Sequence, residues 1–316
     1  MTTYLIKRLV QSLATILGIV TLVFFLLRAA PGDPIALLIP PDLPPGRHLE
    51  VVAEIRARYG FDRPVVEQYF TYVWRMLRGD FGRSIRTGAP ILDELVVRIP
   101  NTLQLGIMAM LATTLLGVIA GVIAAVNRGR HPDTAVMFLS IAGISIPDFW
   151  FGLMLMVLLG LYWGILPPSG FGGPVYTLEG LRYLVLPLLT LSRGAAGLAR
   201  FTRSSMLDVI SQDYIRTARS KGLAERVVVY RHALKNAMIP VVTILGQSFG
   251  FLVGGVVIVE TVFAWPGVGR YLVSGITGRD YPVVQAGVLM IATSVVFANL
   301  ITDMFYGFLD PRIRYE

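Results

Sequence analysis

The side chains of this sequence that could take part in chemistry are a few ionisable or polar groups in apolar surroundings. Asp148 follows Pro147 directly, and Asn299 and Asp303 are four residues apart, which places them on one face of a helix. Ionisable groups within a membrane span often mark the path of an ion or a substrate. Asp148 would line such a path or cap a helix that restarts after Pro147. Asn299 and Asp303 would face a cavity or, as their spacing favours, form hydrogen bonds within or between helices.

None of the common catalytic motifs is complete in the sequence. A phosphate-binding P-loop needs a Gly-Lys pair, and Lys7, Lys221 and Lys235 all follow other residue types. The histidines form no HExxH motif, Ser84 lacks the second glycine of GxSxG, and the chain has no cysteine. We therefore expect no enzyme, and no cofactor or metal held by this chain. Any energy from ATP would have to arrive through a partner.

The composition of the chain indicates which elements position these groups. The chain has 316 residues, of which 54% are hydrophobic and 15% charged, and its mean hydropathy is +0.66. Soluble domains carry about 25% charged residues, and a spanning helix needs about 20 apolar ones. We therefore predict an all-α integral membrane protein with about six transmembrane helices. The predicted spans are residues 9–27, 102–126, 134–158 (or on to 166), 183–198, 238–259 and 283–309.

The distribution of basic residues predicts the topology. With the N-terminus inside, the cations at 7–8, 128–130, 200–235 and 312–314 lie in the cytoplasm, whereas the short outer loops hold few, as the positive-inside rule requires. The net charge of +8 then reflects topology, and nucleic acid is not an expected partner. We expect one transmembrane domain over 1–316, with a first span in 1–30, an extracytoplasmic segment at 31–101, a five-span core at 102–309 and a cytoplasmic tail at 310–316. Glu260 and Arg193, near span ends, are expected to reach the membrane interface.

Two further patterns concern helix packing. Residues 64–82 place Val66, Tyr69, Phe70, Val73 and Leu77 on one helical face, which predicts a helix at the outer membrane interface or one packed on the protein's own outer surface. Glycines at 117 and 121, and at 246, 250 and 254, are spaced for close helix contacts in the membrane.

The most informative segment is a predicted cytoplasmic loop at 200–237. Leu207, Ile210, Tyr214 and Ala218 form a helical apolar stripe opposite a basic face. Asp213 would be the N-cap of a short helix over 214–220, and a glycine at 222 would follow that helix with positive φ. Such a helix, with small residues at 217 and 218, could enter a groove on a soluble partner; the alternative is a basic helix on anionic lipid.

The loop resembles a known family. Arg216 to Gly222 is similar to the Glu-Ala-Ala-x3-Gly loop of ABC-importer permeases, although Arg216 stands in place of the glutamate. The whole chain resembles the first of the two paired permeases in the dipeptide, oligopeptide and nickel branch. The blocks that carry this resemblance are 28–34 (RAAPGDP), 79–85 (GDFGRSI), 99–105 (IPNTLQL), 146–153 (IPDFWFGL), 213–223 with 231–243, 260–270 (ETVFAWPGVGR), 279–285 (RDYPVVQ) and 309–315 (LDPRIRY).

The resemblance implies a binding-protein-dependent importer in a bacterial or archaeal plasma membrane. Its partners would be a second related permease, two ATPase subunits that bind ATP and Mg²⁺, an extracytoplasmic substrate-binding protein and membrane lipid. It also implies that the short helix of the loop contacts the ATPase subunits. The residues expected at that contact are Asp213, Tyr214, Arg216, Thr217, Ala218, Lys221, Gly222 and Leu223. Pro266, Gly267 and Gly269 would form a sharp turn at an outer gate.

The substrate favoured by the resemblance is a short peptide; nickel chelates, glutathione-like molecules and oligosaccharides are alternatives. An ion-coupled secondary transporter is the main competing class, and it would favour paired carboxylates at the membrane midplane and inverted repeats, which the sequence does not show. An assembly or sensor protein that moves no substrate is the other.

Overall fold

The computed structural model describes residues 2–29, 35 and 48–309, and this part of the chain is helical, with no strand. Its contacts divide the chain into two units: Met1–Pro100 with Gly267–Val296, and Asn101–Pro266 with Phe297–Glu316. The helix α4 (Ile91–Val126) passes from the first unit into the second, and α13 (Tyr281–Leu309) does the same.

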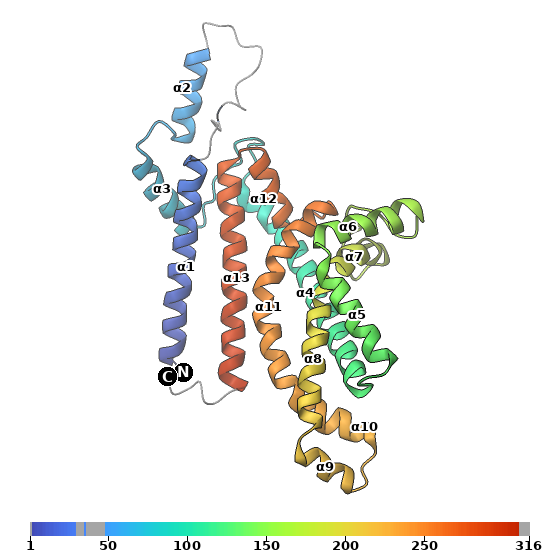
Figure 1. The fold of residues 1–316 in the computed structure, drawn as a ribbon. Coiled ribbons are helices and arrows are strands. Elements are labelled where there is room, and N and C mark those ends of the chain that lie inside the picture. Colours follow the sequence, from blue (N-terminus) through green and yellow to red (C-terminus); the bar gives the residue numbers. More distant parts are fainter. Residues whose placement is uncertain (1, 30–34, 36–47, 310–316) are drawn as a thin grey trace. The chain divides into compact units, whose positions relative to one another are not determined.

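The first unit gathers helices from both ends of the chain. They are α1 (Thr2–Ala29), α2 (His48–Tyr59), α3 (Val65–Leu77), the beginning of α4, α12 (Val268–Thr277) and most of α13 (Figure 1). Its core consists of Ile91, Leu95, Val268, Val283 and Ala286.

A buried carboxylate joins two of the sequence blocks within this unit. Asp280, just before α13, accepts a hydrogen bond from Ser84 Oγ at 2.5 Å and from the backbone N–H groups of Ile85 and Arg86, each at 3.2 Å. It also accepts from the N–H of Val283 at 3.4 Å, so it caps α13 at the same time. The blocks 79–85 and 279–285 are therefore held together by one side chain.

The second unit contains the remaining helices. They are α4 from Asn101 on, α5 (His131–Ser145), α6 (Asp148–Leu155), a π-helix η2 (Met156–Tyr162), α7 (Leu178–Leu191), a 3-10 turn η3 (Ser192–Gly194), α8 (Ala195–Ile210), α9 (Asp213–Ser220), α10 (Glu225–Val227), a π-helix η4 (Val228–Ala233) and α11 (Leu234–Val262). Within this unit α9 and α10 lie at one end of α8 and α11, and the turn after α11 lies at the other end (Figure 1).

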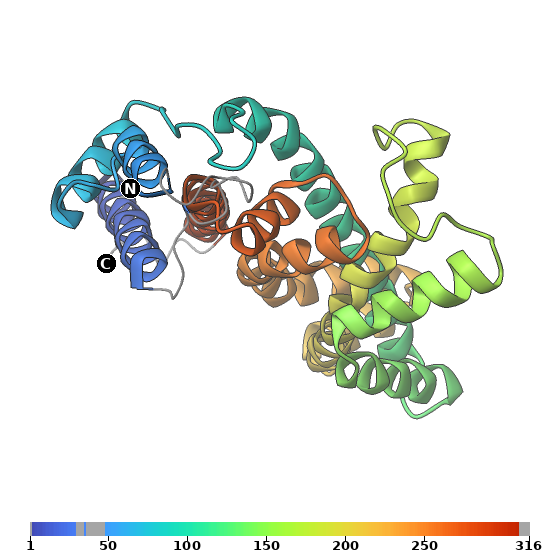
Figure 2. The same ribbon diagram turned by 90° about the horizontal axis from the view of Figure 1, so that it is seen from above.

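Four of the six predicted membrane spans overlap helical stretches that the structure describes, the third is bent, and the fifth is described only in part. Four described helical stretches are long and apolar enough to cross a membrane: Ile6–Ala29, Ile91–Val126, Leu178–Ile210 and Tyr281–Leu300. The predicted third span is not straight, because His131–Ser145 and Asp148–Tyr162 meet at a bend of 104° (Figure 2). The predicted fifth span lies in α11, where side chains at 247–253 are outside the described part, so the total of six stays a prediction.

The bend has a local cause. Pro147 disfavours helical backbone at the residue before it, and Ile146 is extended with φ −94° and ψ 133°. Pro147 then precedes α6, which begins at Asp148. The sequence block 146–153 therefore marks a break between two helices rather than the middle of one.

The glycine pattern is confirmed in α4 and only in part in α11. A Cβ at Gly121 would lie 2.5 Å from Thr202 Cβ and 2.6 Å from the Ala199 carbonyl oxygen, so α4 and α8 touch backbone to side chain there. Gly246 similarly approaches Thr302, whose hydroxyl donates to the Gly246 carbonyl oxygen at 3.1 Å. Gly254 has open space beside it and makes no close approach, and residue 250 lies outside the described side chains.

Candidate functional site

The predicted short helix of the loop exists as α9, Asp213–Ser220. Its N-cap is Gln212, in extended conformation at φ −71° and ψ 151°, and no side chain caps the helix, so the prediction of Asp213 as N-cap is wrong. Asp213 instead opens the first turn, where a carboxylate favours the helix dipole. The predicted end is confirmed: Gly222 has φ +75°, and its N–H donates to the Arg219 carbonyl oxygen at 2.9 Å.

One face of α9 is anchored in the protein's own core. Ile215 is fully buried and Ala218 is 7% exposed, within a cluster that includes Met206, Val228 and Ala233. The predicted stripe is confirmed at Leu207, Ile210 and Ala218, which lie in or against this cluster, and is wrong at Tyr214. Ile215 is buried instead, because α8 ends at Ile210 and a turn at 211–212 resets the helical phase. Ala218 therefore helps to seat the helix on the protein's own core.

Two polar contacts add to this anchor. The Arg219 guanidinium donates to Glu225 through Nε at 3.1 Å and Nη2 at 2.7 Å, and so spans the loop between α9 and α10. The hydrogen bond from Arg219 lowers the pKa of the Glu225 carboxyl. Asn236 Nδ2, at the start of α11, donates to the Tyr214 hydroxyl at 2.7 Å. These contacts hold α9 against two following segments.

The other face of α9 and the turn after it are exposed. This surface carries most of the residues predicted for a partner contact: Asp213, Tyr214, Arg216, Thr217, Lys221, Gly222 and Leu223. Arg216 and Asp213 form only an exposed ion pair at 3.5 Å, which contributes little to stability. The chain thus presents a short helix that is fixed on one side and open on the other, and we call this exposed set the α9 surface.

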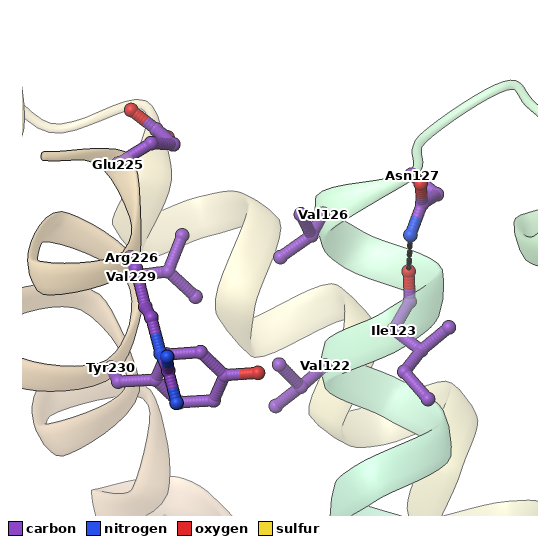
Figure 3. A pocket seen from close by; sticks show the side chains of 8 residues that line it. All are labelled: Val122, Ile123, Val126, Asn127, Glu225, Arg226, Val229 and Tyr230. Atoms are coloured by element: carbon purple, nitrogen blue, oxygen red, sulfur yellow. Dashed lines mark hydrogen bonds between the residues drawn. The ribbon is translucent and has the colours of Figure 1, made fainter.

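Two grooves beside the α9 surface were not anticipated from the sequence. One, of about 260 Å³, lies between the end of α4 and the segment of α10 and η4 (Figure 3). It is lined by Val122, Ile123, Val126, Asn127, Glu225, Arg226, Val229 and Tyr230. The second, of about 390 Å³, is lined by Arg226, Val227, Tyr230 and Arg231. In the sequence, these grooves are indicated only by two arginines and a tyrosine that helical spacing brings close together, Arg226, Tyr230 and Arg231.

The predicted path residue Asp148 has a partner in the structure. Arg193, in η3, donates from Nη1 to Asp148 Oδ1 at 2.5 Å and from Nη2 to the carbonyl oxygens of Gly143 and Ile146. It therefore joins the end of α5 to the start of α6 across the bend. The prediction that Arg193 reaches the interface is wrong, because its side chain is 10% exposed and engaged with these groups. Asp148 does not cap α6, since no side-chain cap bond is formed there.

The other predicted path residues are described only in part. Asn299 is exposed on α13, and the side chain of Asp303 lies outside the described residues. Their mutual hydrogen bond stays a prediction.

The turn after α11 is held by hydrogen bonds to Asn101 in α4. Trp265 is fully buried and donates from Nε1 to the Asn101 carbonyl oxygen at 3.0 Å, while Asn101 Nδ2 donates to the Pro266 carbonyl oxygen at 3.0 Å. Thr102 Oγ1 donates to Glu260 Oε1 at 2.6 Å. Glu260 is fully buried, so the prediction that it reaches the interface is wrong.

This turn differs from the one predicted at Pro266, Gly267 and Gly269. The residue with positive φ is Ala264, at 56°, whereas Gly267 is the extended N-cap of α12 and Gly269 lies inside that helix. The sharp turn therefore comes a few residues earlier than predicted. The backbone N–H of Gly170 donates to the Phe263 carbonyl oxygen at 2.8 Å, and Phe171 meets Trp265 edge to face at 4.9 Å, so a loop before α7 also holds it.

The chain is similar to known proteins along almost its whole length. Residues 117–315 match the family of binding-protein-dependent transport system inner membrane components, and residues 1–106 match the N-terminal model of such membrane components. The chain is 38% identical to the dipeptide transport system permease protein DppB of Escherichia coli strain K12, over 99% of each chain. It is 42% identical to the glutathione transport system permease protein GsiC of Salmonella typhimurium, over 100% of each chain.

Proposed function

Because the chain belongs to the family of inner-membrane components of binding-protein-dependent transport systems, we propose that it moves short peptides and takes its energy through the α9 surface. It is a transport permease and not itself catalytic, and ATP is hydrolysed elsewhere in such a system. The partners proposed are two ATPase subunits that bind ATP and Mg²⁺, a second related permease and an extracytoplasmic binding protein.

The observation that carries the coupling proposal is that α9 is buried in the protein's core on one face and exposed on the other. A helix of eight residues is marginal in water, yet Ile215 and Ala218 seat this one in a packed core. A force on the exposed face is therefore passed to α4, α8 and α11, because side chains of those helices form or line the same core. Movement of α9 by the ATPase subunits would shift these helices and open the path on one side at a time.

The substrate proposal rests on the relatives. Two relatives that match over their full length are named for the transport of a dipeptide and of glutathione, and both molecules are short peptides. Asp148, whose side chain is 56% exposed, is a candidate for the path of such a substrate, and Asn299 and Asp303 are further candidates. The turn at 263–269 is proposed as part of an outer gate. The termini are proposed to lie in the cytoplasm, because that orientation satisfies the positive-inside rule.

The coupling proposal is tested on the assembled complex in proteoliposomes. Thr217→Trp places a bulky group on the exposed face, and we expect ATP-driven dipeptide uptake to be lost while the permease stays inserted and folded. Leu207→Met, a volume-conserving change on the neighbouring helix, is the matched control and should transport normally. Normal uptake by Thr217→Trp would refute the coupling role. Uptake that stops when a proton gradient is removed at constant ATP would instead support an ion-coupled transporter.

A further inference from the structure

The helix α3 has three different faces: one contacts α1, one is polar, and the third is apolar and exposed. One face packs on α1: Tyr69 and Thr21 share a hydrogen bond between hydroxyls at 2.7 Å, and Tyr72 stacks on Phe24 with ring centres 5.7 Å apart. A second face carries Glu67, Thr71, Arg75 and Arg78 and is polar. Figures 1 and 2 both show α3 beside the end of α1.

The third face is apolar and exposed. Val66 is 63%, Phe70 65%, Trp74 57% and Leu77 68% exposed, and no residue of α3 is buried. These side chains recur at helical spacing and form one continuous stripe, which we call the α3 stripe. Large apolar side chains grouped in this way mark a contact with lipid or protein.

The contacts of α3 place the stripe at a definite depth along a membrane span. The part of α1 that is long and apolar enough to cross a membrane is Ile6–Ala29, a stretch of 24 residues and about 36 Å in length. Thr21 lies eight residues before Ala29, which is about 12 Å along the helix. If about 30 Å of this span is hydrocarbon, Thr21 lies about 9 Å inside the boundary. Amphipathic interfacial helices lie about 5–10 Å into the same boundary.

The charged groups around α3 suit a headgroup region rather than water or a protein core. The Arg78 guanidinium lies over the Trp74 ring at 4.4 Å, and the Arg28 guanidinium donates to Gln68 Oε1 at 3.1 and 2.7 Å. Tryptophan and arginine are typical of the level where acyl chains meet lipid headgroups.

We propose that α3 is an interfacial helix whose stripe contacts the acyl chains of the leaflet at the C-terminal end of α1, with its arginines at the phosphates. The sequence pattern left two alternatives, a helix at the membrane interface or one packed on the protein's own surface. Under this proposal both apply, because one face of α3 packs on α1 and another contacts lipid. With the N-terminus inside, this leaflet is the outer one. The contact fixes the height of the extracytoplasmic segment above the bilayer, and it does not depend on the substrate or on the α9 surface.

The chain has no cysteine, so single cysteines can report on this surface without prior replacement. Phe70→Cys and Leu77→Cys sample the stripe, and Glu67→Cys on the polar face is the matched control. Each is spin-labelled in the assembled complex in liposomes, with cysteines of the partner chains removed, and its collision rates with oxygen and with a water-soluble nickel chelate are measured. We expect the oxygen-to-nickel ratio at 70 and 77 to be several-fold higher than at 67.

Two results would overturn the proposal. A label at 70 or 77 that collides freely with the nickel chelate lies in water, and a label shielded from both reagents lies against a partner protein. A second measurement uses Trp74 itself as the reporter and needs no spin label. Brominated lipids should quench the tryptophan fluorescence of the unsubstituted protein more strongly than that of Trp74→Phe. Equal quenching with and without Trp74 would contradict lipid contact.

Discussion

The substitution Ile215→Ala tests whether α9 is held by its own chain's core. Ile215 is fully buried, and the change removes three carbon atoms from a packed cluster. At about 0.8 kcal/mol for each buried methylene plus a cavity term, the loss is about 2–4 kcal/mol. Since 1.4 kcal/mol is about tenfold in an equilibrium constant, undocking of α9 should become about 30-fold to 700-fold more frequent. The amides at 215–222 should lose protection from hydrogen exchange by a similar factor.

Hydrogen exchange by mass spectrometry on the assembled complex measures this directly. Val227→Ala is the control, because Val227 is partly exposed and lies near the same loop. It should leave exchange at 215–222 almost unchanged, and amides within α4 should not respond to either variant. Unchanged exchange in Ile215→Ala would refute the argument that this side chain seats α9. Loss of transport without increased exchange would mean that the residue acts by another route.

The other predictions concern the ends of α9 and the contacts of α4 and α5. Gly222→Ala forces a Cβ into left-handed backbone at a cost of about 1–2 kcal/mol, so uptake should fall. Gly106→Ala is the control: its Cβ would make an ordinary contact with Val256 at 4.0 Å, and the variant should transport normally. Gly121→Ala sets a Cβ against Thr202 and should lower the complex's unfolding temperature by overpacking worth about 1–3 kcal/mol; an unchanged temperature would exclude the close approach. Asp133→Ala leaves Arg203 without the carboxylate that it contacts at 2.5 and 2.7 Å, and should lower the unfolding temperature more than Asp133→Asn does. The folded-state pKa of Glu225 lies below its ordinary value of 4.5, so its pairing with Arg219 stabilises the loop above pH 4.5 and is lost as the pH falls through the folded pKa. Both groups are about half exposed, so the pairing should stabilise the loop by less than about 1 kcal/mol. Hydrogen exchange at 219–225 should show this pH dependence, and Glu225→Gln should remove it.

Features that depend on local pattern were predictable from the sequence. Hydropathy located the first, second and last predicted spans within α1, α4 and α13, and the glycine at 222 marked the end of α9 because positive φ favours glycine. Pro147 carried the signal for the bend between α5 and α6, but not its size, since the angle depends on what the two helices pack against.

Features that depend on distant contacts were not predictable. Glu260 and Arg193 were expected at the interface. Glu260 is fully buried and the Arg193 side chain is only 10% exposed, because Thr102, Gly143 and Ile146, far away in the sequence, supply their hydrogen bonds. Ala264 takes a conformation that favours glycine because the burial of Trp265 holds the turn. Ile215 rather than Tyr214 faces the core because the turn at 211–212 changes the helical phase.

The most direct test of the central claim asks what the α9 surface touches. A photo-crosslinker attached to Thr217→Cys, in a chain that otherwise has no cysteine, samples the middle of the exposed face in the assembled complex in membranes. We predict an adduct with an ATPase subunit whose yield changes when ATP is added. An adduct with lipid alone, or with the second permease, would contradict the account that this surface receives the energy for transport.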